Sequence, residues 1–352
     1  MRVLILSAYD AVSHKQLNSG LMSNIDADFT LLGLPPRFFA WRTKGNSLSF
    51  AFENREELTK GYDLIFATSL TDITSLRGFV PELAHTPLIV YFHENQFDYP
   101  ENRSEYGTVE TKITSIYNAL AADTVVFNTE YNRQSFLKGA SALLKKMPDH
   151  VPAGLVDMIK AKSRVISVPV YPVKKGVDTD GKPVILWNHR WEYDKAPERF
   201  LAVLRSLKRR GADFRLNLAG QTFRNTPESY GEIMKEFADH IDHEGYAPTR
   251  EGYEDVVASS NVIISTSLHD FQGLSVIEAA DAGCVPVLPQ RVAYTEIFDK
   301  KYLYACSDDI YEEAEHCAEL ILNRPQEKCD MSRFYWENLK GEYQSLFENT
   351  AK

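Results

Sequence analysis

Two acidic residues eight positions apart form the most informative pattern in this sequence. Asp270 and Glu278 lie in the segment HDFQGLSVIEAADAG, residues 269–283. A helix that starts shortly after a glycine would direct its free N–H groups and its dipole at an anion such as a diphosphate. Asp270 and Glu278 could then accept hydrogen bonds from sugar and ribose hydroxyls. Four residues between the two acids are expected to line the same ligand: Phe271, Gln272, Gly273 and Leu274.

A plainer interpretation of this pair is that Asp270 caps the helix and Glu278 lies on its solvated face. The run SVIEAADAG is small and apolar around Glu278, which is typical of a buried helix. A carboxylate buried there needs a partner, so we favour a binding role.

A second cluster, WNHRWEYDK, follows a predicted strand that ends at Trp187. Asn188 is expected to contact the same ligand as Asp270 and Glu278. Arg190 and Lys195 could converge on its two phosphates. Such cations would stabilise a departing diphosphate. The alternative is a surface ion pair with Glu192 or Asp194.

Two loops of the first half carry further polar residues. His93, Glu94, Asn95 and Gln96 directly follow a buried strand, where packing alone does not explain them. Ser13, His14 and Lys15 lie in the first strand-to-helix loop. The alternatives are a simple turn at His93, and a helix cap at Ser13 followed by solvated side chains.

Three weaker candidates lie in the second half. Gly220 and Gln221 follow a predicted strand and could line the site, and Tyr246 could lie beside a nucleobase. The Gly245–Tyr246 pair could equally be a turn glycine and a core aromatic.

These residues need a framework, and short apolar runs alternating with amphipathic ones supply it. The alternation predicts α/β halves with parallel sheets covered on both faces. The expected domains are residues 1–170 and 183–330, joined by a linker at 171–182 and followed by a closing helix within 331–352. The expected strands are Val3–Ser7, Phe29–Leu32, Asp63–Ala67, Leu88–Phe92, Thr124–Phe127, Val165–Val168, Val184–Trp187, Phe214–Ala219, Val262–Ser265, Val285–Leu288 and Tyr302–Tyr304.

Composition limits the function classes. The apolar share of 44% allows a core in each half, and the four scattered cysteines indicate reduced thiols. The net charge of −10 argues weakly against broad nucleic-acid binding, although residues 1–170 are nearly neutral. The first segment is expected to be a strand and not a secretory signal, and no apolar run is long enough for a bilayer. These features predict a soluble, cytoplasmic protein without a membrane role or an obligate protein partner.

The motifs together resemble the family-4 glycosyltransferases of the GT-B fold over the whole chain. The resemblance implies two Rossmann-like lobes whose parallel sheets face an interlobe cleft. It implies that Asp270 and Glu278 hold the donor sugar and ribose, that Arg190 and Lys195 bind the diphosphate, and that His93 contacts the sugar near the reaction centre. It also implies retaining front-face transfer. Because the two cations do the work of a metal, we expect no metal and no cofactor.

Longer strings are similar to the tRNA-queuosine mannosyltransferases. This resemblance implies transfer of mannose from GDP-mannose to the cyclopentenediol of queuosine in an aspartate tRNA. Two departures are Asp10-Ala11-Val12, where relatives usually have glycines, and Asp270, where much of the wider family has Glu. The strings are SHKQL at 13–17, YFHENQ at 91–96, YP at 99–100, VVFN at 125–128, PDH at 148–150 and NHRWEYDK at 188–195.

A tRNA acceptor would need cations and stacking rings in the first half. Phe38, Phe39 and Trp41 lie among the first cations and could stack on unpaired bases. The alternative is that PPRFFAWR packs, with its arginines reaching solvent. The expected tRNA-binding residues are Arg37, Arg42, Lys44, Lys138, Lys145 and Lys146.

Other functions remain open at this point. The acceptor could be a lipid, a glycan or a small molecule, and Lys138–Lys146 is a short candidate for membrane contact. The chain could also be a non-catalytic nucleotide-sugar or RNA-binding module. An NAD-dependent enzyme is disfavoured because neither half has a G-x-G-x-x-G loop.

Overall fold

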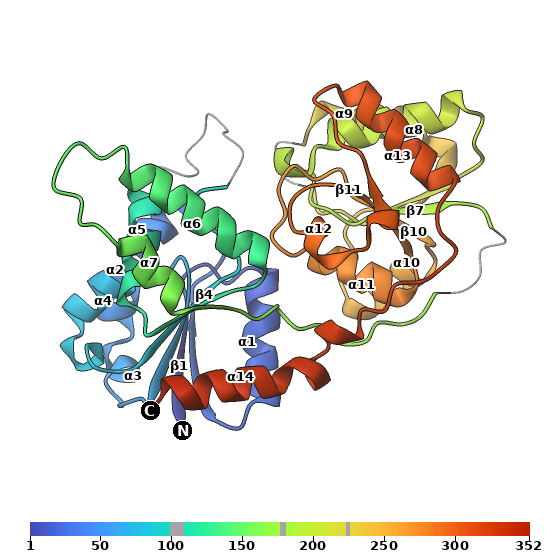
Figure 1. Cartoon of the computed structure of the whole chain (residues 1–352). Helices are drawn as coiled ribbons and strands as arrows, with labels where there is room; N and C mark the ends of the chain where they lie inside the picture. The colour runs from blue at the N-terminus through green and yellow to red at the C-terminus, as the bar shows by residue number, and fades with distance from the viewer. Residues whose placement is uncertain (99–108, 177–180, 223–225) are drawn as a thin grey trace. The chain divides into compact units, whose positions relative to one another are not determined.

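The chain divides into two compact units, each built around its own sheet (Figure 1). The computed structural model describes residues 1–98, 109–176, 181–222 and 226–352. The first unit comprises Met1–Pro169 and Trp336–Lys352, and the second comprises Val170–Tyr335. The chain therefore passes between the units twice. Tyr99 and Pro100 of the first-half motif, and part of the expected linker, lie outside the described residues.

The first unit contains a six-stranded sheet in the order β2-β1-β3-β4-β5-β6, and every pairing is parallel. Val3–Leu6 and all residues of β3 and β4 are buried, as expected when helices cover both faces of a sheet. The strands are β1 Arg2–Ser7, β2 Asp28–Gly33, β3 Leu64–Thr68, β4 Leu88–Phe92, β5 Thr124–Phe127 and β6 Ser163–Val165.

The last helix of the chain completes the first unit. Trp336 packs against Gly20 of α1 so closely that a Cβ at Gly20 would lie 2.2 Å from the indole. The Tyr343 hydroxyl lies 3.3 Å from the Tyr91 hydroxyl and donates to the Ser167 carbonyl at 3.0 Å. The helices of this unit are α1 Val12–Asn24, α2 Phe39–Glu53, α3 Arg55–Leu58, α4 Ile73–Phe79, α5 Val109–Ala121, α6 Glu130–Leu144, α7 Leu155–Ala161 and α14 Trp336–Thr350.

The second unit contains a parallel six-stranded sheet in the order β12-β11-β10-β7-β8-β9. Counted from β7, this is the 3-2-1-4-5-6 order of a doubly wound dinucleotide-binding sheet. The strand order reverses between β7 and β10, and ligands bind beyond the carboxyl ends of strands at such a point. The strands are β7 Val184–Trp187, β8 Arg215–Leu218, β9 Ile241–Glu244, β10 Val262–Ile264, β11 Val285–Pro289 and β12 Leu303–Tyr304.

Local signals in the sequence place the helices of the second unit. Pro197 occupies the first turn of α8, and the Thr249 and Asp309 side chains cap α10 and α13 by accepting backbone N–H bonds. The helices are α8 Pro197–Arg209, α9 Glu228–Glu236, α10 Arg250–Ala258, α11 Leu274–Ala282, α12 Tyr294–Ile297 and α13 Ile310–Leu322.

Most expected strands match the structure to within one residue at each end, and three differences have a physical reason. The sixth strand is Ser163–Val165 and not Val165–Val168, because Ile166 and the residues after it leave the sheet for the segment that passes to the second unit. Residues 300–302 form a 3₁₀ turn, so the last strand is shorter than expected. Strand β9 was not expected, since at this sheet edge three of its four residues are polar and all four are half-exposed or exposed. Within the described ranges, no helix combines the length and apolarity that a membrane span requires.

Candidate functional site

The loops after β7 and β10 meet at the carboxyl edge of the second unit's sheet. Asn188, His189 and Arg190 directly follow β7, and His269–Gly273 lie between β10 and α11. Because β7 and β10 are neighbouring parallel strands, the topology brings these two predicted clusters together. They lie at the point where the strand order reverses, which is the expected ligand position in such a sheet.

Lys195 is the charged centre of this edge. Its Nζ lies 2.8 Å from the His269 carbonyl and 3.3 Å from Oδ2 of both Asp194 and Asp270. The Thr266 hydroxyl donates to the Lys195 carbonyl at 2.9 Å, which ties the two loops together. Lys195 is thus mostly buried and held in place before any ligand arrives.

The Asp270 carboxylate is stabilised in its ionised form. It accepts hydrogen bonds from the Tyr294 hydroxyl at 3.0 Å and from the backbone N–H of Gln272 at 3.3 Å. Burial alone would raise its pKa, but Lys195, His189 and Tyr294 together lower the pKa of Asp270 to about 2. Burial opposes the charge of Lys195 as well, yet Asp270 and Asp194 raise the pKa of Lys195 above its usual value. The two partners therefore remain a charged pair near neutral pH.

Gly273 opens the start of α11 beside this pair. It has φ +71° and precedes Leu274, where α11 begins. A Cβ at Gly273 would lie 2.8 Å from Cε1 of Tyr294, so a side chain here would displace the ring that binds Asp270. Gly273 occupies the cap position of α11, and no side chain caps the helix there. The interpretation of Asp270 as the helix cap is therefore wrong.

Glu278 is buried one turn into α11, so the solvated-face interpretation is also wrong. Its Oε1 accepts from Arg250 Nη1 at 2.8 Å, and Arg250 also pairs with Glu254 at 2.7 Å. Burial raises the pKa of Glu278, and Arg250 opposes that shift. Arg250, half-exposed on α10, was not among the predicted residues. A buried carboxylate predicts a partner, but nothing in the sequence indicates which cation it is.

Asn188 joins this second group through Tyr253, which was not among the predicted residues either. The Asn188 amide donates to the Tyr253 hydroxyl and to the Ser275 carbonyl, both at 3.0 Å. Tyr253 also hydrogen-bonds Glu278, which helps to hold that carboxylate ionised. Asn188 therefore links the β7 loop to α10 and α11.

Arg190 pairs with a carboxylate other than the two around Lys195, although its charge acts on Lys195 and His269. Its Nη1 pairs with Glu192 Oε2 at 3.0 Å, and the side chain is 53% exposed. This is the surface ion pair that was the alternative for Arg190. An exposed pair of this kind contributes little to stability.

The three weaker candidates have different surroundings. A Cβ at Gly220 would lie 1.9 Å from the His189 carbonyl, so this glycine lets β8 and the β7 loop pack closely. Gln221 is exposed, and its carbonyl accepts from the Trp191 amide. Tyr246 is 60% exposed, which makes the core-aromatic alternative wrong.

A second polar site lies in the first unit, at the edge of its sheet where the parallel strands end. The rings of His14, on α1, and His93, after β4, have centroids 4.0 Å apart. Burial lowers the pKa of His14 to about 4, and burial together with His14 lowers the pKa of His93 well below its usual value. Both rings are therefore neutral near pH 7. Ser13 does not cap α1, because Ala11 occupies the cap position without a side-chain bond.

Several buried polar atoms of this second site have no hydrogen-bond partner in the described protein. They are both ring nitrogens of His14, Nε2 of His93 and both amide atoms of Gln96. Native proteins pair most such atoms with protein, water or ligand. Glu94 is half-buried beside them, while Lys15 is exposed.

Asn95, unlike Gln96, has its side-chain amide hydrogen-bonded within the protein. Its amide donates to Asn132 Oδ1 at 2.8 Å, and the Asn132 amide donates to Asn128 Oδ1 at 2.8 Å. Asn128 in turn donates to the His93 carbonyl at 2.8 Å. This chain of amides holds the loop after β4 in place.

Asp10, in the loop after β1, is accommodated at the same edge. Asp10 accepts hydrogen bonds from Ser7 at 2.9 Å and from Asn18 at 3.1 Å. The carboxylate is buried by these contacts and closes the loop after β1.

Comparison with known proteins identifies the two units. Residues 2–170 match the model of the tRNA-queuosine alpha-mannosyltransferase N-terminal family, and residues 173–333 match glycosyl transferases group 1. The tRNA-queuosine alpha-mannosyltransferase of Drosophila melanogaster is 31% identical over 319 residues, which cover 87% of this chain and 84% of the relative. The chain belongs to the tRNA-queuosine alpha-mannosyltransferase family. It is a glycosyltransferase, as the motifs predicted.

Solved structures support the fold assignment. Sucrose-phosphate synthase from Thermosynechococcus elongatus matches with a TM-score of 0.68 at 14% identity, covering 99% of this chain and 98% of the other. HepE from Anabaena, solved with UDP-glucose, matches with a TM-score of 0.65 at 12% identity, covering 99% and 100%. The predicted GT-B class, with two Rossmann-like lobes, is confirmed.

The six basic residues that were predicted to bind tRNA fall into two groups, one around the start of α2 and one within or after α6. Arg37, Arg42 and Lys44 lie at the start of α2, near the carboxyl end of β2. Lys138 lies within α6, whereas Lys145 and Lys146 follow its end. Since α6 has 15 residues, those two lysines are about 22 Å from the edge where the helix begins.

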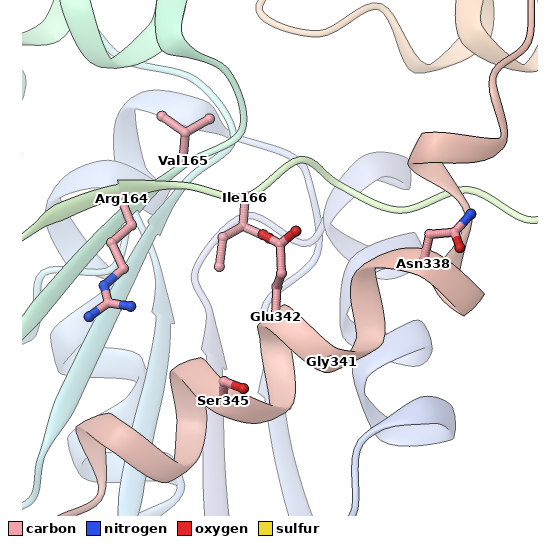
Figure 2. Close-up of a pocket in the computed structure, with 7 residues that line it drawn as sticks. All are labelled: Arg164, Val165, Ile166, Asn338, Gly341, Glu342 and Ser345. Carbon is pink, nitrogen blue, oxygen red and sulfur yellow. The ribbon is translucent and has the colours of Figure 1, made fainter.

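A groove in the first unit lies away from both sites. Figure 2 shows it between β6 and α14, with Arg164 and Glu342 among the residues along its walls. None of the predicted site residues lines it. We assign the groove no role.

Proposed function

We propose that this glycosyltransferase moves mannose from GDP-mannose to a hydroxyl of the cyclopentenediol of queuosine in tRNA. The name of the Drosophila relative supports the sugar and the acceptor. A GDP-mannose:cellobiosyl-diphosphopolyprenol alpha-mannosyltransferase of Xanthomonas oryzae supports the donor. That relative is 21% identical over 181 residues, covering 48% of this chain and 47% of its own length.

The Lys195–Asp270 pair beside the start of α11 is the observation that carries the donor assignment. An ionised Asp270 can only accept hydrogen bonds, which suits sugar hydroxyls. The amides at the start of α11 and the Lys195 ammonium suit the diphosphate. Glu278 accepts from the ribose hydroxyls, and Arg190 exchanges Glu192 for a phosphate oxygen.

The transfer itself breaks the bond between the anomeric carbon and the β-phosphate oxygen. The queuosine hydroxyl attacks the same face of an oxocarbenium-like carbon, and its proton passes to the departing phosphate oxygen. GDP-mannose carries an α-linked sugar, so an α-linked product means retention. Lys195, Arg190 and the α11 dipole stabilise the negative charge on GDP as it develops. We propose that no divalent metal takes part in this step.

The first unit supplies the site for the acceptor end of the reaction. His14, His93 and Gln96 present buried, neutral groups that can both donate and accept. Neutral groups of this kind suit hydroxyls, whereas a phosphate would favour cations. We assign this set to the reacting hydroxyls of the sugar and the diol.

A second candidate keeps the donor and changes the acceptor to a lipid-linked glycan. The Xanthomonas relative, whose name describes such an acceptor, is the observation that favours it. The weaker identity and shorter coverage of that match make it the second choice.

The test is incubation of the protein with queuosine-containing tRNA and, in parallel, GDP-mannose, UDP-glucose or UDP-galactose. Nucleosides from the digested tRNA are then analysed by mass. We expect one hexose on queuosine with GDP-mannose, with or without EDTA. Transfer only from a UDP-sugar would reject the donor, and no transfer to tRNA with transfer to a lipid-linked glycan would favour the second candidate.

A further inference from the structure

Two large aromatic side chains protrude from the first unit where α2 begins. Phe38 is 70% exposed and Trp41 is 53% exposed, so neither belongs to the core. Phe39, between them, packs edge-on against Tyr9 at 5.5 Å, in the loop that runs from β1 to α1 and His14. The exposed rings therefore flank a residue that packs on the loop leading into α1, the helix that carries His14.

The Trp41 indole is seated on the helix by a glycine. Gly45 lies four residues further along α2, and a Cβ there would lie 2.6 Å from Cζ2 of Trp41. Glycine weakens a helix interior relative to alanine, so its presence here needs a reason. At this position it lets the indole lie against the helix while more than half of the side chain remains exposed.

Phe38 has an unusual backbone for a bulky residue. Its φ and ψ are 56° and 55°, in the left-handed region that side chains other than glycine rarely adopt. The Arg37 guanidinium lies 5.7 Å from the centre of its ring. Backbone strain of this kind is concentrated at binding sites, where the surrounding structure maintains it.

The segment of sequence around these rings carries charges of one sign. Residues 34–52 include Arg37, Arg42 and Lys44 and contain no Asp or Glu, in a chain whose net charge is −10. Exposed rings interleaved with cations are the pattern that binds single-stranded nucleic acid, because bases stack on the rings and phosphates pair with the cations. An anionic lipid surface also attracts cations and aromatic rings, so vesicle binding is one arm of the test below.

We propose that Phe38 and Trp41, with Arg37, Arg42 and Lys44, form a base-stacking platform for unpaired nucleotides of an RNA loop. The inference rests on the proposed function in that RNA is the acceptor. It adds the surface that holds the bases beside the modified nucleoside. The platform positions the loop and takes no part in the transfer step.

The test uses an anticodon stem-loop RNA with 2-aminopurine at unpaired loop positions, titrated with the intact protein. Stacking on an indole quenches this probe. We expect Trp41→Ala to weaken binding about tenfold and to relieve the quenching, as losing one stacked base predicts. Trp41→Phe should retain part of the affinity. The matched control is Phe52→Ala, since Phe52 is 73% exposed near the other end of α2 and packs on Phe79.

A second pair of variants tests the seat of the indole. Gly45→Ala should weaken RNA binding although alanine favours the helix, because the new methyl displaces Trp41. In a Trp41→Ala background the same change should have no further effect. Donor turnover, measured as GDP release from GDP-mannose without RNA, should be unchanged in all these variants.

Equal RNA binding by Trp41→Ala, Phe52→Ala and wild-type protein would overturn the platform. So would loss of GDP release in parallel with RNA binding, since Trp41 would then have a packing role. Binding to anionic vesicles that requires Trp41, with no RNA binding, would assign the surface to lipid. If RNA binding requires Trp41 but wild-type protein adds no mannose to queuosine-containing tRNA, the platform stands and the proposed function fails.

Discussion

The Lys195 ammonium lies 3.3 Å from the Asp270 carboxylate, in the loops after two neighbouring strands. Asp194 lies at the same distance from the ammonium. This arrangement changes what a substitution of Lys195 tests, because removing the cation leaves two mostly buried carboxylates unpaired. Loss of activity can then reflect lost stability as well as lost catalysis.

We expect Lys195→Met to abolish transfer and to lower the free energy of unfolding by about 3–5 kcal/mol, the usual cost of breaking a buried ion pair. The double variant Lys195→Met/Asp270→Asn should regain part of that stability and remain inactive. Chemical denaturation and a GDP-mannose turnover assay measure the two effects. Turnover restored along with stability would show that Lys195 acts only in folding.

Glu278 and Arg250 make a prediction about pH. Burial raises the pKa of Glu278 and Arg250 opposes the shift, so Arg250→Gln should raise that pKa further. If Glu278 has a higher pKa, it becomes protonated at a higher pH and from there on accepts fewer hydrogen bonds from the ribose hydroxyls. The acidic limb of kcat/KM for GDP-mannose should therefore move to higher pH in Arg250→Gln and disappear in Glu278→Gln. Superimposable profiles for wild type and Arg250→Gln would reject this role for Glu278.

Gly273→Ala should weaken GDP binding because it combines backbone strain with a clash against Tyr294. Gly211→Ala is the matched control, since Gly211 has φ +68° and nothing within 4 Å of its added Cβ. The left-handed backbone costs about 1–2 kcal/mol in both variants. Calorimetry with GDP should show weaker binding only for Gly273→Ala, and equal affinity in the two variants would contradict the account of Gly273.

The sequence predicted the fold class and most strands because buried parallel strands are continuous apolar runs. It also placed Lys195, Asp270 and Glu278, because polar residues after a strand or within a buried helix need an explanation. The partners of those residues could not be predicted. Arg250 is 28 positions from Glu278 and Tyr294 is 24 from Asp270, and only the packing of α10 and α12 brings them together. The Arg190–Glu192 pair is a local contact that the sequence offered as an alternative, and binding of the diphosphate by Arg190 stays a prediction.

The buried histidines predict a loss of stability in mild acid. His14, His189 and His269 have pKa values lowered to about 4, mainly by burial. Between about pH 6.5 and pH 4 the unfolded chain binds protons that the folded chain does not, so stability falls as pH falls. Each histidine should cost about 2 kcal/mol at pH 5 relative to pH 7. Denaturation of wild type and His14→Asn at both pH values checks this, and an identical pH dependence in the two proteins would contradict it.

The most direct test of the central claim compares two tRNA preparations that differ only in queuosine. Each is incubated with GDP-mannose and this protein. The tRNA is then digested, and the nucleosides are separated and identified by mass spectrometry. The account predicts that queuosine gains one mannose in the α configuration, while tRNA with guanosine at that position gains nothing. Equal labelling of both tRNAs, or no labelling of either by an enzyme that releases GDP, would contradict it.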